Sequence, residues 1–301
     1  MSGAKIIFVF PAFANDYSEF HHFQCPDFLS CFKSLVEDAS SFIDDQLKDF
    51  HPLRNNFLED ELRNQYMSYI FGCTIAEMLR EKKVIPDCIA GLSMGLYAAL
   101  QTSGAFSFRD GLLLIRQAYL EIDKINSGLE FSMGNVIGLN QSDIVQLIKN
   151  IDRDTQISNQ MAEFSFVISG RKTSVVTILE QAREEGALHT RLLNATAPYH
   201  SFFLKDTRKT FEPFVRNLGV RPSSVSLVSV IDQGTIRTSE QIIREIVRNL
   251  YQPFNWFNTQ RKLQETAGSV LIECGVSRNL SKNSKFIPGQ ASFFSAVDYR
   301  D

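Results

Sequence analysis

Runs of apolar residues and their spacing predict an alternation of strands and helices over most of the chain. Ile6 to Phe10 is a continuous apolar run ended by Pro11, which is typical of a buried strand in a parallel sheet. Apolar residues at helical spacing predict three long helices, over residues 28–47, 59–83 and 106–125. Short apolar runs predict further strands of the same sheet, near residues 225–231 and 269–272. The pattern favours an α/β domain built on a parallel sheet.

The middle of the chain follows a different pattern of shorter elements. Strands and helices alternate in the order strand, helix, strand, helix, strand, over residues 132–139, 143–149, 164–170, 173–186 and 188–193. This order resembles a compact ferredoxin-like unit inserted into the larger domain. We therefore predict an α/β-hydrolase-like catalytic domain formed by residues 1–128 and 195–301, with a ferredoxin-like subdomain over residues 129–194. A long helix over residues 201–218 leads back to the main sheet.

The segment from Gly91 to Gly95 has the form Gly-x-Ser-x-Gly, with Ser93 at its centre. A short apolar run ends just before it, and a stretch rich in alanine and leucine, both good helix formers, follows. Strand, sharp turn and helix are the context of a nucleophile elbow, which presents a serine hydroxyl at the mouth of a pocket. The backbone N–H of Met94, at the start of the helix, can then stabilise an oxyanion. The alternative is a structural turn in which Ser93 only caps the helix.

A serine nucleophile needs a base, and the chain has five histidines. His21 and His22 adjoin an acidic and aromatic loop, whereas His51 and His189 lie in segments without other chemical signals. His200 follows a loop of small residues, where the predicted helix begins. Because an isolated histidine is more often a surface or core residue than a catalyst, position alone makes His200 only a candidate.

Several motifs in a fixed order resemble the malonyl-CoA:acyl carrier protein transacylases and the acyltransferase domains of fatty-acid and polyketide synthases. They are Phe8 to Pro11, the elbow from Gly91 to Leu100, Leu113 to Gln117 around Arg116, Met133 to Leu139, Phe166 to Gly170, Tyr199 to Ser201, Leu250 to Trp256 and Ile272 to Gly275. These motifs are spread over nearly the whole chain, which makes them far more specific than the elbow alone.

The resemblance implies a two-step transfer through an acyl-enzyme. Ser93 attacks the thioester of malonyl-CoA while His200 accepts its proton, and the phosphopantetheine thiol of an acyl carrier protein then takes the acyl group. The backbone N–H groups of Phe13 and Met94 form the oxyanion hole, and the backbone carbonyl of Gln252 orients His200 in place of an aspartate. Any acceptor on one ring nitrogen suffices, because it fixes the tautomer and leaves the other nitrogen free as a base. The implied partner is a carrier protein, or a synthase that lacks its own acyltransferase.

Arg116 decides the substrate class in this resemblance, because a planar guanidinium binds a carboxylate through two hydrogen bonds. It makes malonyl or a related dicarboxylic acyl group a better substrate than acetyl or a long fatty chain. Without the resemblance, Arg116 would be interpreted as a helix residue that is paired with Asp110 or solvated. Leu92 and Tyr199 are implied to line the acyl pocket, with Tyr199 at a position where malonyl-selective members usually have phenylalanine.

The first loop departs from the family pattern. Where the family has Pro-Gly-Gln-Gly-Ser-Gln, this chain reads Pro11-Ala-Phe-Ala-Asn-Asp16, so Phe13 replaces the glutamine and alanines replace two glycines. Phenylalanine still has a backbone N–H to donate, but alanine resists positive φ, so a different path of the loop is expected. Loss of an oxyanion donor would lower the rate by about 10²- to 10³-fold.

Charge, hydropathy and cysteine content limit the classes of partner and the cellular compartment that we expect. The formal net charge of −3 gives no indication of a surface for nucleic acid or for an anionic membrane. No stretch approaches the ~18 apolar residues of a membrane helix, and the apolar run near the N-terminus is too short for a signal peptide. Five cysteines without a Cys-x-x-Cys pair suit reduced thiols in a cytoplasmic protein. We expect no metal and no tightly bound cofactor.

Three other functions remain open from the sequence. An acyl hydrolase on the same fold would clear acyl groups from the carrier proteins of a polyketide pathway, with water in place of the thiol. A docking or scaffold protein of a synthase complex would not need both Ser93 and His200. A lipase-like hydrolase would require an acid between these two residues in the chain, such as Asp143 or Asp152.

Overall fold

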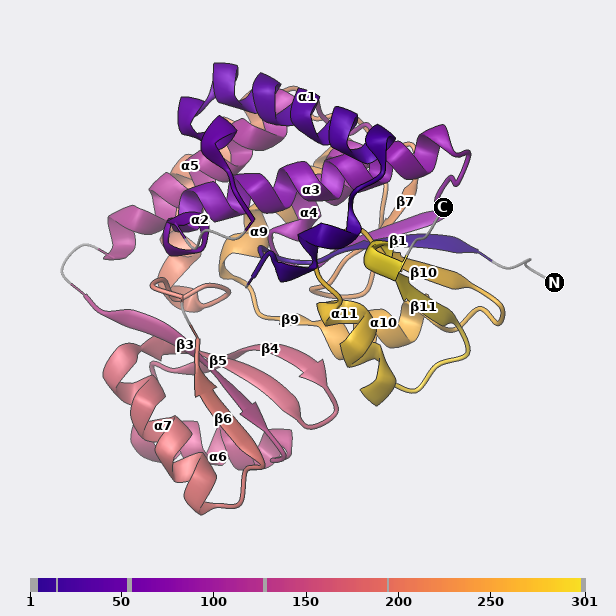
Figure 1. Cartoon of the computed structure of the whole chain (residues 1–301). Coiled ribbons are helices and arrows are strands. Elements are labelled where there is room, and N and C mark those ends of the chain that lie inside the picture. The colour runs from indigo at the N-terminus through magenta and orange to yellow at the C-terminus, as the bar shows by residue number, and fades with distance from the viewer. Residues whose placement is uncertain (1–4, 15, 53–55, 127–128, 194, 299–301) are drawn as a thin grey trace.

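Eleven strands form two separate sheets in the described part of the chain (Figure 1). The computed structural model describes residues 5–14, 16–52, 56–126, 129–193 and 195–298. The larger sheet has the strand order β11-β10-β1-β2-β7-β8, and the smaller sheet has the order β6-β3-β5-β4-β9. In Figure 1 the smaller sheet, with α6 and α7, lies below the larger α/β part.

The larger sheet is parallel except at one edge. Its strands are β1 (Ile6–Phe10), β2 (Cys88–Gly91), β7 (Ser226–Val228), β8 (Thr235–Ile236), β10 (Val270–Glu273) and β11 (Ser292–Ser295). β1 pairs in parallel with β2 and β10, whereas β7 and β8 are antiparallel. Phe8 and Phe10 belong to one apolar core, and Ile7 and Val9 belong to the other. Both faces of β1 are therefore buried, as its continuous apolar run predicted.

Helices cover both faces of the larger sheet. The core that contains Phe8 is formed with α1 (Pro26–Phe42), α3 (Glu61–Glu81), α4 (Gly95–Thr102), α5 (Phe108–Asn126), α8 (Arg208–Asn217) and α9 (Ser239–Tyr251). The opposite core is formed with α10 (Trp256–Leu263) and α11 (Asn279–Asn283). Shorter helical segments are α2 (Asn56–Glu59), η1 (Ser18–His22), η2 (Asp45–Asp49), η3 (Phe202–Thr207), η4 (Ser284–Phe286) and η5 (Ala296–Asp298).

Two predicted helices differ from the structure in length or type. The helix predicted over residues 28–47 ends at Phe42, and its last part is the separate 3-10 turn η2. The helix predicted over residues 201–218 begins as the 3-10 turn η3 and becomes α-helical only in α8. The reason in the second case is local, because Ser201 takes an extended conformation directly after His200.

The smaller sheet contains two strands that the sequence did not predict. Its strands are β3 (Phe131–Ile137), β4 (Gln156–Ala162), β5 (Ser165–Arg171), β6 (His189–Leu192) and β9 (Phe254–Asn255), with α6 (Gln141–Ile151) and α7 (Lys172–Glu184) packed on it. The pairing of β4 with β5 is interrupted by two register shifts, so its apolar residues do not alternate regularly. β9 is only two residues long and joins β4 in parallel.

The predicted division into two domains stays a prediction. The proposed boundary residues 128 and 194 lie outside the described residues. The smaller sheet also takes one strand, β9, from beyond residues 129–194. In the described ranges, no helix combines the length and the apolar character needed to cross a bilayer.

Candidate active site

Ser93 occupies the sharp turn between β2 and α4, at the carboxyl end of a central strand. Its φ is 53°, in the left-handed region that non-glycine residues rarely adopt. A Cβ at Gly95 would lie 2.2 Å from the carbonyl oxygen of Phe10, and one at Gly91 would lie 2.4 Å from the Cα of Leu96. Both glycines are therefore needed for the close approach of strand and helix. The N-cap of α4 is Met94, without a side-chain cap, so Ser93 does not serve as a helix cap.

Ser93 and His200 form a hydrogen-bonded pair, with 2.8 Å between Ser93 Oγ and His200 Nε2. His200 is 4% exposed, and its φ of 56° is also left-handed. Its backbone N–H donates to the carbonyl of Leu250 at 3.0 Å. The ring of Phe254 stands edge-on to the imidazole, with 4.6 Å between centroids. Strained backbone at two facing polar residues is typical of a functional site.

Burial keeps His200 in its neutral form. It lowers the pKa of the imidazole from 6.5 to about 4, while the backbone carbonyls of Asn249 and Gln252 raise it by a smaller amount. Nδ1 makes no hydrogen bond of regular geometry to any described residue, so these carbonyls act at longer range. Neither Asp143 nor Asp152 is among the groups that influence this pKa, which leaves the lipase-like hypothesis without its acid.

Asn249 contacts both members of the pair and was missed by the sequence analysis. Its side-chain Nδ2 donates to the carbonyl of Ser93 at 3.1 Å, and its own carbonyl is the first of the two that raise the pKa of His200. The predicted carbonyl of Gln252 is the second. A main-chain carbonyl can come from any residue type, so no residue pattern identifies Asn249 in this role. The C-terminal end of α9 thus contacts both Ser93 and His200.

The two residues predicted to supply the oxyanion donors, Phe13 and Met94, line the same small cavity of about 10 Å³. Neither backbone N–H donates to another described residue. The loop that carries Phe13 is fixed by α3, since Ser68 Oγ accepts from the N–H of Ala14 at 2.8 Å and Asn64 Nδ2 donates to its carbonyl at 2.8 Å. Ala12, Phe13 and Ala14 all have negative φ, so the alanines fit this loop without strain.

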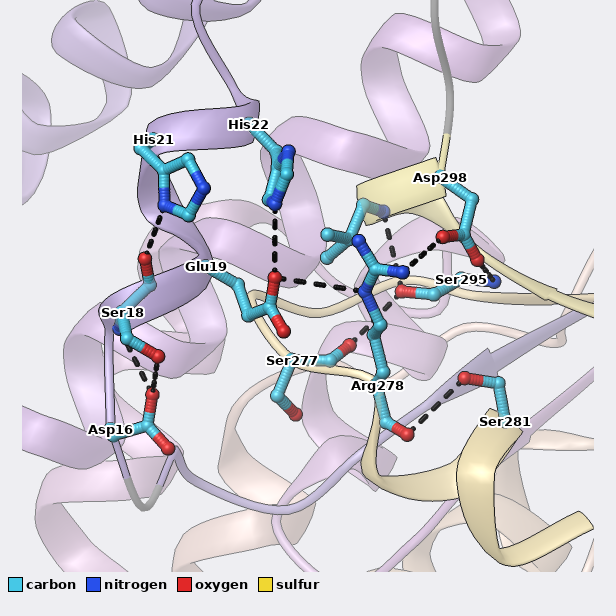
Figure 2. Close-up of polar contacts among 11 residues, drawn as sticks. Asp16, Ser18, Glu19, His21, His22, Ser277, Arg278, Ser281, Ser295 and Asp298 are labelled. Atoms are coloured by element: carbon cyan, nitrogen blue, oxygen red, sulfur yellow. Dashed lines mark hydrogen bonds and ion pairs between the residues drawn. The ribbon is translucent and has the colours of Figure 1, made fainter.

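The segment after this loop is tied to the C-terminal part of the chain by a polar cluster (Figure 2). Glu19 Oε2 of η1 lies 3.2 Å from His22 Nε2 and forms an ion pair with Arg278 at 3.6 Å. Arg278 also pairs with Asp298 at 2.6 Å, and His21 Nδ1 lies 2.6 Å from the carbonyl of Ser18. These contacts give His21 and His22 partners outside the Ser93–His200 pair.

Arg116 lies on α5 with its side chain exposed. Its predicted alternative partner, Asp110, instead accepts hydrogen bonds from the backbone and hydroxyl of Ser107. Within the described ranges Arg116 has no ion pair. Burial raises the pKa of Tyr66, and the positive charge of Arg116 lowers it by a smaller amount. The structure therefore leaves this guanidinium accessible to an anion.

The two residues expected in the acyl pocket are both buried, at 7% exposure each. Leu92 donates its backbone N–H to the carbonyl of Phe10 at 2.8 Å. The phenol of Tyr199 hydrogen-bonds to Glu61 and accepts from Gln65 Nε2 at 3.3 Å. Burial and the Glu61 carboxylate raise the pKa of Tyr199 well above its usual value. Glu61 and Gln65 are further residues that sequence reasoning did not single out.

Comparison with known proteins identifies relatives at low sequence identity. No protein-family model matches the chain. A malonyl CoA-acyl carrier protein transacylase of Bacillus subtilis is 24% identical over 210 residues, 69% of this chain and 66% of that protein. The corresponding transacylase of Haemophilus influenzae is 26% identical over 216 residues, 71% of this chain and 69% of that protein. The matched region thus spans about two thirds of these curated relatives.

Solved structures agree over nearly the whole chain. The malonyl CoA-acyl carrier protein transacylase of Coxiella burnetii has a TM-score of 0.85 at 21% identity, covering 98% of this chain and 94% of that one. A malonyl-transacylase solved in complex with its type II polyketide synthase acyl-carrier protein has a TM-score of 0.86 at 20% identity, covering 98% and 97%. This chain therefore has the fold of the malonyl CoA-acyl carrier protein transacylases. The predicted fold class and the resemblance in sequence are both confirmed.

Proposed function

We propose that this chain is an acyltransferase that moves a malonyl group, or a related dicarboxylic acyl group, from CoA to the phosphopantetheine thiol of an acyl carrier protein. The observation that carries the proposal is the 2.8 Å contact between Ser93 Oγ and His200 Nε2 at a nucleophile elbow. The names of the relatives and the shared fold agree with this chemistry. A paired nucleophile and base also argues against a purely scaffolding role.

In the first step Ser93 Oγ attacks the thioester carbonyl, and its proton passes to His200 Nε2. A bond forms between Oγ and the carbonyl carbon, and the bond to the CoA sulfur breaks as the protonated imidazole returns the proton to the leaving thiolate. His200 can accept this proton at neutral pH because burial keeps the ring uncharged. The N–H groups of Phe13 and Met94 are the proposed donors that stabilise the tetrahedral oxyanion.

In the second step the phosphopantetheine thiol attacks the Ser93 ester. His200 now removes the thiol proton and delivers it to Ser93 Oγ as the ester bond breaks, which regenerates the free enzyme. The same two side chains serve both half-reactions, so the proposed mechanism needs no cofactor beyond the two substrates. Asn249 and Gln252 supply the carbonyls that favour the protonated ring during each transfer.

Arg116 is the proposed partner of the malonyl carboxylate. Its exposed guanidinium, without a described ion pair, can bind both carboxylate oxygens. Leu92 and Tyr199 are proposed to form the wall of the acyl pocket. The hydrogen bonds of Tyr199 to Glu61 and Gln65 hold its ring in one orientation.

The proposed partner is an acyl carrier protein or a synthase that lacks its own acyltransferase. One structural neighbour is a malonyl-transacylase in complex with such a carrier protein, which supports this choice. We place the protein in the cytoplasm, because all five of its cysteines are free thiols and a reducing compartment keeps thiols in that state.

The decisive test is the intact mass of the protein after brief incubation with malonyl-CoA, with and without a carrier protein. We expect a malonyl adduct that Ser93→Ala abolishes and that a carrier protein discharges. Arg116→Ala should slow malonyl loading by about 10- to 100-fold relative to acetyl loading, from the ~1.5–3 kcal/mol of a charged hydrogen bond. Arg109→Ala is the matched control, because Arg109 lies on the same helix and pairs with Asp38.

The same experiment separates transfer from hydrolysis. Phe13, in place of the family glutamine, is the feature that keeps an acyl hydrolase as the second candidate. An adduct that forms only from donors without a carboxylate, or that is lost to water without a carrier protein, would favour the hydrolase. Normal loading of the Ser93→Ala protein would refute the acyl-enzyme mechanism altogether.

A further inference from the structure

The side chain of Gln156 hydrogen-bonds to the backbone on both sides of Ser201. Its Nε2 donates to the carbonyl of His200 at 3.1 Å, and its Oε1 accepts from the N–H of Phe202 at 3.2 Å. Gln156 is the first residue of β4 in the smaller sheet, and its side chain is only half-buried. The catalytic histidine is thus held from an element far from it in sequence.

His200 needs such support because its backbone is left-handed, with φ at 56°. A residue with a Cβ returns to the right-handed or extended region unless its neighbours prevent this. The N–H of His200 is fixed by the carbonyl of Leu250, and its carbonyl is fixed by Gln156. With both ends of the residue held, its Cα–Cβ bond has one direction, from which Nε2 reaches Ser93 Oγ.

A second contact comes to His200 from the same sheet. β4 pairs in parallel with β9, and the ring of Phe254 in β9 stands edge-on to the imidazole. The hydrogen bond from Asn255 Nδ2 to Gln160 Oε1, at 2.8 Å, fixes β9 against β4. The smaller sheet therefore contacts His200 at its backbone through Gln156 and at its ring through Phe254.

We infer that Gln156 is a positioning residue for His200, and that the smaller sheet thereby sets the geometry of the Ser93–His200 pair. Removing both hydrogen bonds lets the His200 backbone relax and moves Nε2 away from Ser93 Oγ. Misplacement of a reacting group by about 1 Å costs on the order of 100-fold in rate. The inference rests on the proposed function, in which His200 is the base.

The test compares Gln156→Leu with Gln146→Leu in the full chain. Gln146 lies on α6, which packs on the same sheet, and its carboxamide hydrogen-bonds to Asn150 of the same helix at 2.9 Å rather than to β9 or to His200. For Gln156→Leu we expect kcat of malonyl transfer to fall by about 10- to 100-fold with KM changed less than about twofold. Gln146→Leu should keep kcat within about twofold of wild type. Gln156→Glu retains the acceptor for the N–H of Phe202, so its kcat should lie between those of Gln156→Leu and wild type.

A second measurement separates this inference from the proposed function. A fluorophosphonate probe forms a bond from phosphorus to Ser93 Oγ and releases fluoride, and its rate depends on His200 but on no acyl donor. The probe should react about 10- to 100-fold more slowly with Gln156→Leu than with wild type. This result supports the inference even if malonyl-CoA proves not to be the substrate. Equal probe rates for Gln156→Leu and wild type, or an equal loss in Gln146→Leu, would overturn it.

Discussion

The buried, neutral state of His200 predicts an unusual dependence of activity on pH. The difference between a pKa of 6.5 and one of about 4 means that the protein destabilises the protonated ring by about 3.4 kcal/mol relative to the neutral ring. A base with a pKa of about 4 is about nine tenths neutral at pH 5, whereas an ordinary histidine is only about 3% neutral there. The two cases therefore differ by about 30-fold in rate at pH 5.

The assay is the second-order rate constant for acylation of Ser93, measured with subsaturating malonyl-CoA from pH 3.5 to 8 by quenching and intact mass, because this constant reports the pKa in the free enzyme. We expect a plateau above about pH 5 and half of the maximal rate near pH 4. His200→Ala should lack this inflection. Half of the maximal rate at pH 6 to 7 would show that the ring is solvated in the free enzyme, and the reasoning from burial would be wrong.

Acid unfolding must be followed in parallel, because the same pKa affects stability. The unfolded chain binds a proton at His200 below pH 6.5, but the folded chain binds it only below about 4. This group therefore removes stability as the pH falls from 6.5 towards 4, by up to about 3.4 kcal/mol. Fluorescence of the single tryptophan, Trp256, which is fully buried, reports whether the fold persists at each pH.

Three further predictions concern the scaffold of the site. Gly95→Ala should abolish acylation of Ser93 and lower the free energy of unfolding by about 3 kcal/mol or more, because the added Cβ would lie 2.2 Å from the carbonyl oxygen of Phe10. Gly104→Ala is the control, because Gly104 has a left-handed φ but no atom within 4 Å of the added Cβ. It should lower the free energy of unfolding in urea by only about 1–2 kcal/mol. Ser68→Ala should lower kcat by up to about 100-fold with little change in KM, because it removes the acceptor of the Ala14 N–H, next to the proposed oxyanion donor Phe13. Unchanged steady-state kinetics would contradict a role of Ser68 in holding this loop. Burial raises the pKa of Glu245 to about 7, so its contribution to stability is fully present below pH 4.5 and is lost as the pH rises through 7. Glu245→Gln does not titrate, so its stability relative to wild type should rise between pH 5 and pH 8 by about 2.5 kcal/mol, and urea unfolding at both values measures this.

Much of the fold was predictable because its signals are local. β1 is a continuous apolar run between a lysine and a proline, and the observed strand has the predicted bounds. The elbow could be recognised from Gly91, Ser93 and Gly95, whose steric requirements lie within five residues. Helix ends were less predictable, as in α1, which stops at Phe42 although apolar residues continue.

The parts that were missed depend on contacts between distant segments. β9 has two residues, which is too short for any periodic pattern, and it becomes a strand only by pairing with β4. Gln156 and Asn249 are ordinary polar residues in sequence. Their importance comes from hydrogen bonds to His200 and Ser93, which lie 44 and 156 positions away along the chain.

The sequence by itself predicted the reactive side chains. The serine between two glycines was predicted from residue type and spacing, and the histidine from the resemblance to a known family. The tertiary structure alone decided that these two side chains meet at 2.8 Å and that the histidine is neutral. It also brought the main-chain carbonyls of Asn249 and Gln252 near the imidazole, where they raise its pKa. These properties depend on burial and on backbone conformation, which are set by packing between two sheets and have no signature in the order of residues.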